Sequence, residues 1–478
     1  MRELKMFIDG RFVENTSGKW IKVLNPSTEE VTSMMPDGTV DDVKKAINAA
    51  EKAQPAWEAT PAIERAGYLR KIADGIRKRA DEIANIIVRE GGKTQGLAMV
   101  ETIFTADYID YMAGWARHYE GEIVQSDRRG ENIFIFKRPI GVTTGILPWN
   151  FPFFLIARKA APALVTGNTI VLKPSQLTPE NAFVFAQIVE EVGLPAGVLN
   201  IVNGRGSVVG HELAANPKVG MVSLTGSVEA GQSTMEAASK NITKVSLELG
   251  GKAPAIVMAD ADLDLAVKSI IDSRVDNTGQ VCNNAERVYV DKKVKDEFTK
   301  KLVAGMKAVK VGDPNKIKDL DMGPLIEARA LESVQWKVDN AIKQGARLLL
   351  GGHRIGTSGY FFEATVLDNV TQDMDIIRQE TFGPVIPIVE YDTIDQAIEW
   401  ANDSEYGLTS SVYTTNLDNA IKVNRKLKFG ETYINRENFE AMQGFHAGWR
   451  KSGIGGADGK HGLEEYLQTH VVYLDTKE

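Results

Sequence analysis

The sequence predicts an α/β protein built around a doubly wound parallel sheet. From residue 141, apolar strand segments alternate with helical segments, and a second alternation begins at Ala255. Strands that alternate with helices of this length are typical of parallel sheets covered by helices on both faces. Ligands of such sheets bind beyond the carboxyl ends of the strands. The length of 478 residues leaves room for about three domains.

The first 140 residues predict elements outside this alternation. A strand pair is expected over residues 7–25 with its turn at 14–18, and apolar residues at helical spacing predict helices over 41–56, 63–90 and 95–119. Residues 121–139 alternate in the manner of strands, and 471–474 predict an edge strand. An unpaired arm and edge strand would be an exposed pairing surface in a monomer. We therefore expect a homo-oligomer, a tetramer in particular.

Composition and charge argue against several classes of function. The formal net charge is −8 and the sequence pI is near 5.5, which disfavours nucleic acid and anionic membranes as partners. The sequence has no run of about 20 apolar residues, and residues 1–10 lack the apolar core of a signal peptide. One cysteine cannot form an internal disulfide. A cytoplasmic enzyme or binding protein is expected, without a membrane or nucleic-acid partner.

Cys282 is the only cysteine, and it ends the polar, glycine-containing segment 277–282. A lone cysteine is most often a small core residue. The surroundings of Cys282 favour a nucleophile instead. A thiol attacks as its thiolate, and a nearby base or cation promotes that form. The upstream segment 247–252 supplies a carboxylate at Glu248.

Two other polar side chains follow predicted strands. Lys173 comes directly after the strand predicted over 169–172, so its ammonium is expected at the ligand edge of the sheet; a surface lysine is the alternative. Asn150 lies between Pro148 and Pro152, whose rings restrict the turn. Its amide can donate to an oxyanion, although a structural Asx-turn would have the same sequence.

Two glycine-containing turns have features of nucleotide-binding motifs. The turn at 204–210, which includes Gly206, has one residue too many before its last glycine and lacks the acidic residue expected about 20 positions later. An ordinary βα turn explains it equally well. In the turn at 224–231, Ser227 and the N–H groups of the next helix can hold a pyrophosphate. An N-cap serine is the alternative.

The sequence contains no pattern for a metal site or a serine hydrolase. The six histidines lack metal-ligand spacing, and a single cysteine offers no cluster. No Gly-x-Ser-x-Gly turn is present. No metal is expected.

Several motifs together resemble the aldehyde dehydrogenase superfamily. In chain order they are Asn150, Lys173, the segment 248–252, the Gly279-Gln280-x-Cys282 turn and the segment 380–384. The likeness runs from about residue 7 to the C-terminus, and the glutamate and cysteine motifs together are highly specific. Residues 433–440 and 444–448 are most similar to a bacterial branch that oxidises lactaldehyde and glycolaldehyde.

The resemblance implies three structural parts. A dinucleotide-binding domain would contain residues 1–119 and 140–250, and an α/β catalytic domain would contain residues 251–450. A small β part over 120–139 and 451–478 would bridge subunits.

The resemblance also implies a reaction. Cys282 attacks the aldehyde carbon to give a thiohemiacetal, whose oxyanion is held by Asn150 and the backbone N–H of Cys282. Hydride then leaves to C4 of the nicotinamide of NAD. Glu248 activates water to hydrolyse the resulting thioester to a carboxylic acid, and Lys159 carries protons. Oxyanion donors are needed because a thiohemiacetal gives up hydride readily only when its oxygen carries negative charge.

The same resemblance assigns cofactor contacts. Lys173 contacts the adenosine ribose, Ser227 the pyrophosphate and Glu380 the nicotinamide ribose. Phe382 packs beside the nicotinamide. Gln176 and Gly206 complete the expected cofactor-binding set.

Three positions depart from the family pattern. Gln176 replaces a glutamate that would repel a 2′-phosphate, so NAD is expected with NADP as the alternative. Arg158 occupies a position that is often a tunnel aromatic, and His446 lies in a changed Pro-Phe-Gly-Gly segment. Arg158, His446 and Glu440 would together make the substrate tunnel polar. An alkyl aldehyde would leave these groups unpaired, at a cost of about 1–3 kcal/mol each.

A polar tunnel favours a small hydroxyaldehyde such as lactaldehyde or glycolaldehyde. A carboxylated aldehyde such as succinate semialdehyde, held by Arg158, is the alternative, and Arg158 could instead form a salt bridge with another loop. Intact Cys282, Glu248 and Asn150 argue against a non-enzymatic protein on this fold. Glu248 as a hydrolytic base argues against a CoA-acylating enzyme.

Overall fold

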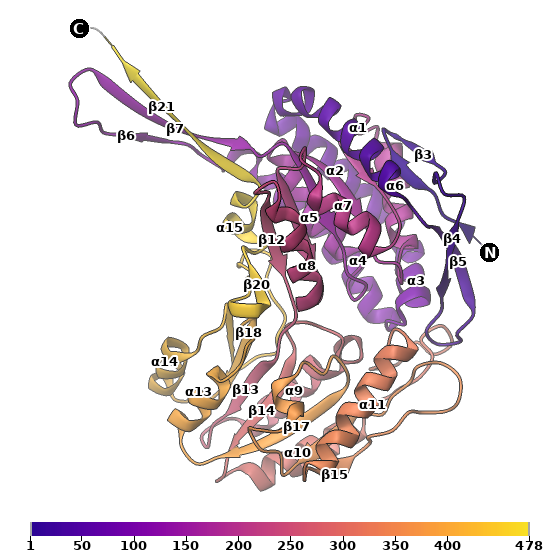
Figure 1. Ribbon diagram of the computed structural model, residues 1–478. Helices are drawn as coiled ribbons and strands as arrows, with labels where there is room; N and C mark the ends of the chain where they lie inside the picture. The colour runs from indigo at the N-terminus through magenta and orange to yellow at the C-terminus, as the bar shows by residue number, and fades with distance from the viewer. Residues whose placement is uncertain (1, 477–478) are drawn as a thin grey trace.

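The computed structural model describes residues 2–476, which form two α/β lobes and a narrow arm projecting from the first lobe (Figure 1). Each lobe contains one large sheet with helices on its faces. The predicted α/β class is thereby confirmed. The first lobe comes mainly from the N-terminal half of the chain and the second from residues after 250, as the colour change in Figure 1 shows.

The first lobe is built on an eight-stranded sheet. Its five central strands are parallel: β12 (Lys244–Glu248), β11 (Met221–Thr225), β8 (Val142–Ile146), β9 (Thr169–Lys173) and β10 (Leu199–Ile201). Antiparallel strands complete both edges: β2 (Met6–Ile8) and β3 (Arg11–Val13) beyond β10, and β20 (Gly453–Ile454) beyond β12. The parallel strands place Thr225 and Glu248 side by side at their carboxyl ends.

Helices cover both faces of this sheet. They are α1 (Val40–Ala59), α2 (Ala62–Lys78), α3 (Ala80–Gly91), α4 (Gln95–Gly114), α5 (Phe154–Val165), α6 (Glu180–Val192), α7 (His211–Ala215) and α8 (Val228–Ser239). Ile170 and Leu172 of β9 pack into one core, and Val171 packs into the other. A strand buried on both faces reads as a continuous apolar run, which is why the sequence located β9 well.

The N-terminal elements differ from the sequence prediction. The first hairpin turns at Asp9 and Gly10, which both have positive φ, as a two-residue hairpin requires. A small separate sheet contains β1 (Arg2–Glu3), β5 (Val31–Pro36) and β4 (Trp20–Leu24). Because β4 pairs with β5, the predicted strand pair around residues 14–18 is wrong.

Two helix boundaries also differ. The helix predicted over 63–90 breaks at Arg79 into α2 and α3, and α4 ends at Gly114, before a short 3₁₀ turn over Trp115–Arg117. Apolar spacing continues across both sites, so it does not reveal where the backbone leaves helical geometry.

The second lobe holds a seven-stranded sheet. In spatial order its strands are β15 (Arg347–Leu350), β16 (Thr365–Asp368), β17 (Val385–Tyr391), β14 (Ala285–Asp291), β13 (Ala253–Val257), β18 (Thr409–Tyr413) and β19 (Glu431–Ile434). All neighbours are parallel except β15 and β16. The covering helices are α9 (Leu263–Val275), α10 (Lys295–Lys307), α11 (Ala328–Lys343), α12 (Asp375–Arg378), α13 (Ile394–Asn402) and α14 (Leu417–Lys426).

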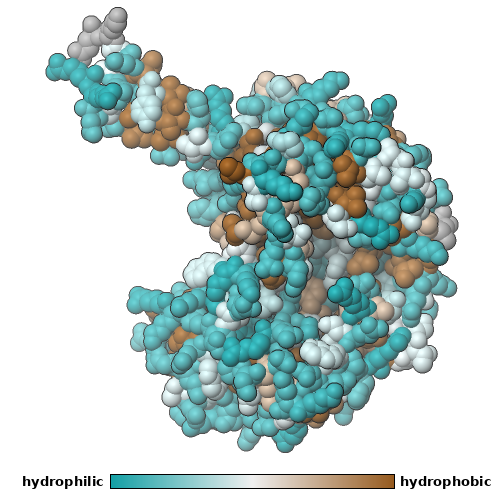
Figure 2. Space-filling model, viewed as in Figure 1, coloured by the Kyte–Doolittle hydropathy of each residue, from teal (hydrophilic) through white to brown (hydrophobic). Residues whose placement is uncertain are grey.

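The arm is an antiparallel three-stranded ribbon of β6 (Glu122–Val124), β7 (Glu131–Pro139) and β21 (Leu467–Asp475). The expected boundary at residue 451 is too early for this arm. Strand β20 joins the first-lobe sheet, and α15 (Gly459–Glu464) contacts α5 of that lobe. Apolar side chains gather on the arm in Figure 2. Among residues 2–476, no helix is long and apolar enough to cross a membrane.

Candidate active site

A cavity of about 490 Å³ lies between the two lobes. Its walls include eight of the residues singled out from the sequence: Asn150, Arg158, Ser227, Glu248, Cys282, Glu380, Phe382 and Glu440. These residues come from segments far apart in the chain. Lys159, Lys173, Gln176, Gly206 and His446 do not line the cavity wall.

Cys282 faces this cavity from a tightly wound turn between α9 and β14. Asn277, Thr278 and Gly279 all have positive φ, so the chain passes through three left-handed residues in succession. A Cβ atom on Gly279 would lie 2.3 Å from the carbonyl oxygen of Gly383, so only glycine fits. Cys282 is partly exposed rather than packed in a core. The reading of this cysteine as a small core residue is therefore wrong.

Asn150 is tied to the cysteine turn by two hydrogen bonds. Its Nδ2 donates to the carbonyl oxygen of Gln280 (3.1 Å), and its own carbonyl oxygen accepts from Nδ2 of Asn277 (3.2 Å). An amide nitrogen carries two hydrogens, and Gln280 takes only one of them. These bonds join the turn that carries Asn150 to the turn that carries Cys282. Both Asn150 and Cys282 line the cavity.

Glu248 ends β12 and lines the same cavity, although its side chain is almost fully buried. Its Oε2 accepts a hydrogen bond from the hydroxyl of Thr225 (3.2 Å) and lies 3.7 Å from Nη1 of Arg158. A carboxylate with few partners inside a cavity can accept a proton from water.

Lys159 lies behind Glu248 rather than on the cavity wall. Its Nζ donates to Oγ of Ser223 (2.8 Å) and to Oγ1 of Thr225 (3.0 Å). Burial lowers the pKa of Lys159 to about 8, although the Glu248 charge acts in the opposite direction. Thr225 thus connects Lys159 with Glu248 through hydrogen bonds. Thr225 was not among the predicted site residues, and its one signal in the sequence is its place in the turn at 224–231.

Arg158 is paired within the chain. Its Nε donates to Oδ1 of Asp458 (3.0 Å), and its Nη2 contacts Asp458 Oδ2 and donates to Oε1 of Glu440 (2.9 Å). Burial opposes its charge, but Asp458, Glu248 and Glu440 together raise the pKa of Arg158 well above its usual value. The expectation that Arg158 forms a salt bridge with another segment fits this geometry. Asp458 was missed, since nothing in its local sequence links it to α5.

Glu440 and His446 interact electrostatically, but only Glu440 lines the cavity. Oε2 of Glu440 accepts a hydrogen bond from Nδ2 of Asn283 (2.6 Å). Asn283 is the residue directly after Cys282 in the chain. His446 is buried, with Nδ1 at 2.5 Å from Oε1 of Glu431. Burial opposes protonation of His446, but the Glu431 carboxylate and a contact with Cys282 raise its pKa well above the usual value. Its Nε2 has no hydrogen-bond partner among residues 2–476.

Comparison with known proteins decides the family. The profile of the aldehyde dehydrogenase family matches residues 12–472. The chain belongs to the aldehyde dehydrogenase family. It is an NAD- or NADP-dependent enzyme, and the resemblance inferred from the motifs is confirmed.

Several named proteins are similar to this aldehyde dehydrogenase over nearly its whole length. Lactaldehyde dehydrogenase from Escherichia coli K12 is 66% identical over 471 residues, which is 98% of each chain. A 3,6-anhydro-α-L-galactose dehydrogenase from a Vibrio species is 44% identical and covers 99% of this chain and 100% of its own. A crystal structure of E. coli lactaldehyde dehydrogenase superposes with a TM-score of 0.98 over 99% of both chains.

The cofactor side of this aldehyde dehydrogenase contains groups suited to a dinucleotide. Ser227 caps α8 by accepting from the N–H of Ala230 (3.2 Å), and Gly226 and Ser227 line the cavity at that helix N-terminus. Such a terminus binds phosphate through its free N–H groups. Glu380 and Phe382 line the cavity from the other lobe. Ser227 is therefore an N-cap residue, as the alternative interpretation predicts, and it also lines the cavity.

Lys173 ends β9 and is nearly buried. Within residues 2–476 no carboxylate pairs with it, and its Nζ donates to the carbonyl oxygen of Pro174 (3.1 Å). Burial lowers its pKa to about 8. A buried ammonium without an anion at a sheet edge suits ribose or phosphate oxygens, so the residues present fit a dinucleotide.

Gly206 begins a short π-helical segment over Gly206–Gly210, beside that same end of β9: a Cβ atom on Gly210 would lie 3.9 Å from Cδ of Lys173. Gln176 follows the same strand and is half-buried. Among the described residues, no group of three or more His, Cys, Asp or Glu is arranged to hold a metal ion.

Proposed function

We propose that this aldehyde dehydrogenase oxidises a small hydroxyaldehyde, such as lactaldehyde or glycolaldehyde, to its carboxylic acid with NAD. The observation that carries the proposal is the convergence of Cys282, Asn150 and Glu248 on one cavity, beside the charged Arg158 network. The similarity to E. coli lactaldehyde dehydrogenase supports the substrate class.

The first step is attack of the Cys282 thiolate on the aldehyde carbon. A carbon–sulfur bond forms and the carbonyl oxygen becomes an oxyanion. The amide of Asn150, already oriented by Gln280, and the backbone N–H of Cys282 stabilise this oxygen. Because these donors are fixed before the reaction, little reorganisation accompanies the build-up of charge.

The bound dinucleotide supplies the hydride acceptor, and oxidation leaves the acyl group on Cys282 as a thioester. Ser227 and the N-terminus of α8 would hold the pyrophosphate and Lys173 the adenosine ribose, with Gly206 and Gln176 nearby. Glu380 would accept from the nicotinamide ribose, and Phe382 would pack beside the ring. The cavity wall already carries Ser227, Glu380 and Phe382.

Hydrolysis requires a base, and Glu248 is the proposed one. It takes a proton from water, which attacks the thioester carbonyl while Cys282 leaves as thiolate. The proton can pass from Glu248 through the Thr225 hydroxyl to Lys159, since the two links measure 3.2 and 3.0 Å. An amine with a pKa of about 8 exchanges protons readily near neutral pH.

The Arg158 network favours a hydroxyl over a carboxylate on the substrate. Arg158 already has Asp458 and Glu440 as ion-pair partners, with Glu248 at 3.7 Å. A substrate carboxylate would therefore approach three carboxylates around one cation. A hydroxyl can accept from the guanidinium and donate to Glu440, so it satisfies the network without added charge. Succinate semialdehyde, the alternative substrate, is accordingly disfavoured.

NAD is the proposed cofactor and NADP the alternative. Gln176 carries no charge to repel a 2′-phosphate. A 41% identical relative from Picrophilus torridus is named D-glyceraldehyde dehydrogenase (NADP(+)), and a 42% identical solved structure is titled as a complex with NAP. If Gln176 governs the choice, Gln176→Glu will lower kcat/KM for NADP more than for NAD.

A tetramer and a cytoplasmic location complete the proposal. The arm exposes apolar side chains, including Ile123 and Tyr473, at 77% and 67% of their surface. Such a surface is typical of a contact with another subunit. The only cysteine must remain a free thiol to act, which a reducing compartment favours.

The test is a substrate panel with both cofactors, followed by absorbance of the reduced cofactor at 340 nm. We expect the highest kcat/KM for lactaldehyde or glycolaldehyde with NAD, above succinate semialdehyde. Cys282→Ala should abolish turnover while its melting temperature stays near that of the parent protein. Turnover by Cys282→Ala would disprove the mechanism, and a preference for succinate semialdehyde would disprove the substrate class.

A further inference from the structure

Glu286 is a buried carboxylate just beyond the cysteine turn, in β14. It does not line the cavity. Its two oxygens nevertheless accept four hydrogen bonds. Oε2 accepts from Nζ of Lys252 (2.6 Å) and from the backbone N–H of Thr381 (2.7 Å). Oε1 accepts from Nη2 of Arg274 (3.1 Å) and from the backbone N–H of Phe382 (2.9 Å).

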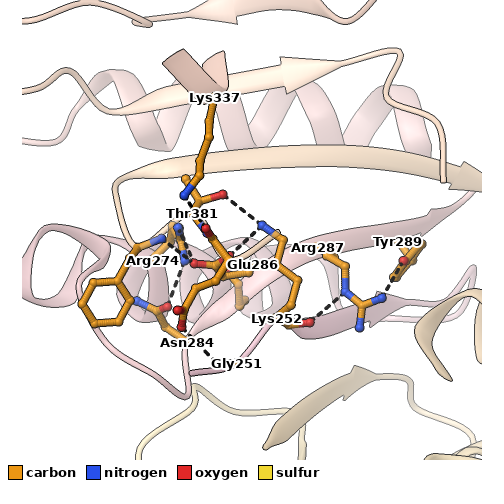
Figure 3. Close-up of polar contacts among 12 residues, drawn as sticks. Gly251, Lys252, Arg274, Asn284, Glu286, Arg287, Tyr289, Lys337 and Thr381 are labelled. Carbon is orange, nitrogen blue, oxygen red and sulfur yellow. Dashed lines mark hydrogen bonds and ion pairs between the residues drawn. The ribbon is translucent and has the colours of Figure 1, made fainter. Parts of the chain in front are cut away.

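Figure 3 shows this cluster, with Lys252 and Arg274 reaching Glu286 from two sides and Thr381 beside it. Lys252 also donates to Oγ1 of Thr381 (2.9 Å). The charge of Glu286 is stable there. Burial acts against it, but the adjacent cations and N–H donors lower its pKa to about 2. A carboxylate, rather than a neutral acid, therefore accepts the two backbone N–H groups.

The segment that Glu286 holds carries the cofactor face of the cavity. Glu380, Thr381 and Phe382 all line the wall. Phe382 has φ of 53°, in the left-handed region that a bulky residue rarely adopts. Such a conformation persists only where surrounding contacts enforce it, and the bond from its N–H to Glu286 is one of them.

Other contacts fix the same segment against the catalytic turns. Oε1 of Glu380 accepts from the N–H of Gly251 (2.9 Å), and a Cβ atom on Gly250 would lie 2.6 Å from Glu380 Oε2. The Phe382 ring packs edge-on against Trp149, at 5.5 Å between centroids. Glu286 thus links the Glu248, Cys282 and Glu380 segments from behind the cavity.

We propose that Glu286 is a positioning residue of the dehydrogenase reaction, which fixes the 380–382 backbone so that the Glu380 carboxylate and the Phe382 ring meet the cofactor. This rests on the cofactor face assigned under the proposed function. Glu286 lies outside the cavity wall and acts through its bonds to the backbone of Thr381 and Phe382. Its loss should therefore weaken cofactor binding and leave Cys282 reactive.

Glu286→Gln provides the test. A carboxamide has one acceptor oxygen, so either Thr381 or Phe382 loses its acceptor whichever way the amide turns. We expect the Kd for NAD, measured by calorimetry without aldehyde, to rise about tenfold, the effect of losing a hydrogen bond to a charged group. NADP should be affected similarly.

The second readout is the alkylation rate of Cys282 by iodoacetamide without cofactor, in which a carbon–sulfur bond forms and iodide leaves. Because this is the only cysteine, the reaction is specific. We expect a rate within twofold of the parent protein. An unchanged Kd would overturn the proposal, as would parallel changes in Kd and alkylation, since these would place the role of Glu286 in the cysteine turn.

Glu90→Gln is the matched control. Glu90 is fully buried, accepts from the backbone N–H of Glu180 (3.0 Å) and lies outside the cavity wall. Its loss should change neither readout more than twofold. If Glu286→Gln does not fold, Glu286→Gln with Lys252→Met removes one of the two cations that lose the carboxylate. Because Lys252 also donates to Thr381, this double variant must give at least a tenfold rise.

Because binding is measured without aldehyde, a failure of the substrate proposal leaves this test intact. Turnover of hydroxyaldehydes with an unaltered Kd in Glu286→Gln would instead refute only the positioning role.

Discussion

Oε2 of Glu248 lies 3.7 Å from Nη1 of Arg158, between the guanidinium and the hydroxyl of Thr225. The proposed base therefore contacts both the substrate end of the cavity and the path toward Lys159. Substitutions at either end should alter different steps of one reaction, and kinetics can separate them.

Glu248→Gln should block hydrolysis while sparing oxidation. The amide cannot accept a proton from water, so we expect kcat to fall at least about 100-fold, the size of a general-base contribution. A single-turnover burst of reduced cofactor should remain. Mass spectrometry of the quenched protein should find the acyl group on Cys282. Loss of the burst itself would show that Glu248 acts before the thioester.

Lys159 should set the alkaline part of the pH profile. Below pH about 8 it is an ammonium and cannot accept a proton, and above that pH the neutral amine can. Where hydrolysis limits the rate, kcat should therefore rise through pH about 8. In Lys159→Met the rate should be lower and this rise absent. A rise that persists in the variant would remove Lys159 from the proton path.

Arg158→Met should reduce discrimination between hydroxyaldehydes and plain aldehydes. A charged donor to a hydroxyl contributes about 1.5–3 kcal/mol, so we expect kcat/KM for lactaldehyde to fall at least about tenfold more than that for propanal. Propanal is the matched substrate because it lacks only the hydroxyl. An equal loss for both would indicate that Arg158 serves only to balance Asp458 and Glu440.

Cofactor affinity should depend on pH through Glu380. Burial, with the nearby Glu286 charge, raises the pKa of Glu380 to about 7. Below that pH the protonated acid loses an acceptor, and above it the carboxylate can accept from ribose hydroxyls. The Kd for NAD should therefore decrease between pH 6 and 8. In Glu380→Gln it should be higher and flat across this range.

The arm should determine the assembly state. Placing lysines at Ile123 and Tyr473 puts one charge on each face of the arm, because these residues pair with the adjacent β7 residues Phe134 and Ile133. A charge at either position disfavours an apolar contact with another subunit. Light scattering should show a tetramer for the parent protein and a smaller species for the double variant. Ile242→Lys is the control, since Ile242 is 93% exposed but lies outside the arm. A monomeric parent protein would contradict the expectation.

The sequence alone determined the α/β class and the residues at the ends of its strands. Strands buried on both faces, such as β9, read as unbroken apolar runs, and Lys173 ends that run. Strand β12 is mixed in polarity, so Glu248 is predicted from the segment 247–252 instead. These signals are local, so a single sequence retains them. The break at Arg79 and the pairing of β4 with β5 lie outside that information, because they depend on backbone geometry and on partners elsewhere.

Only the tertiary structure decided which charges meet. Asp458 reaches Arg158 across 300 positions of sequence, and Glu286 meets Thr381 across 95. Neither spacing leaves a periodic trace, because such contacts arise when separate sheets bring distant segments to one cavity. The proposed nucleophile Cys282 and the proposed base Glu248 could be predicted from their own neighbours in the chain. Their electrostatic surroundings could not, since charge interactions act through space.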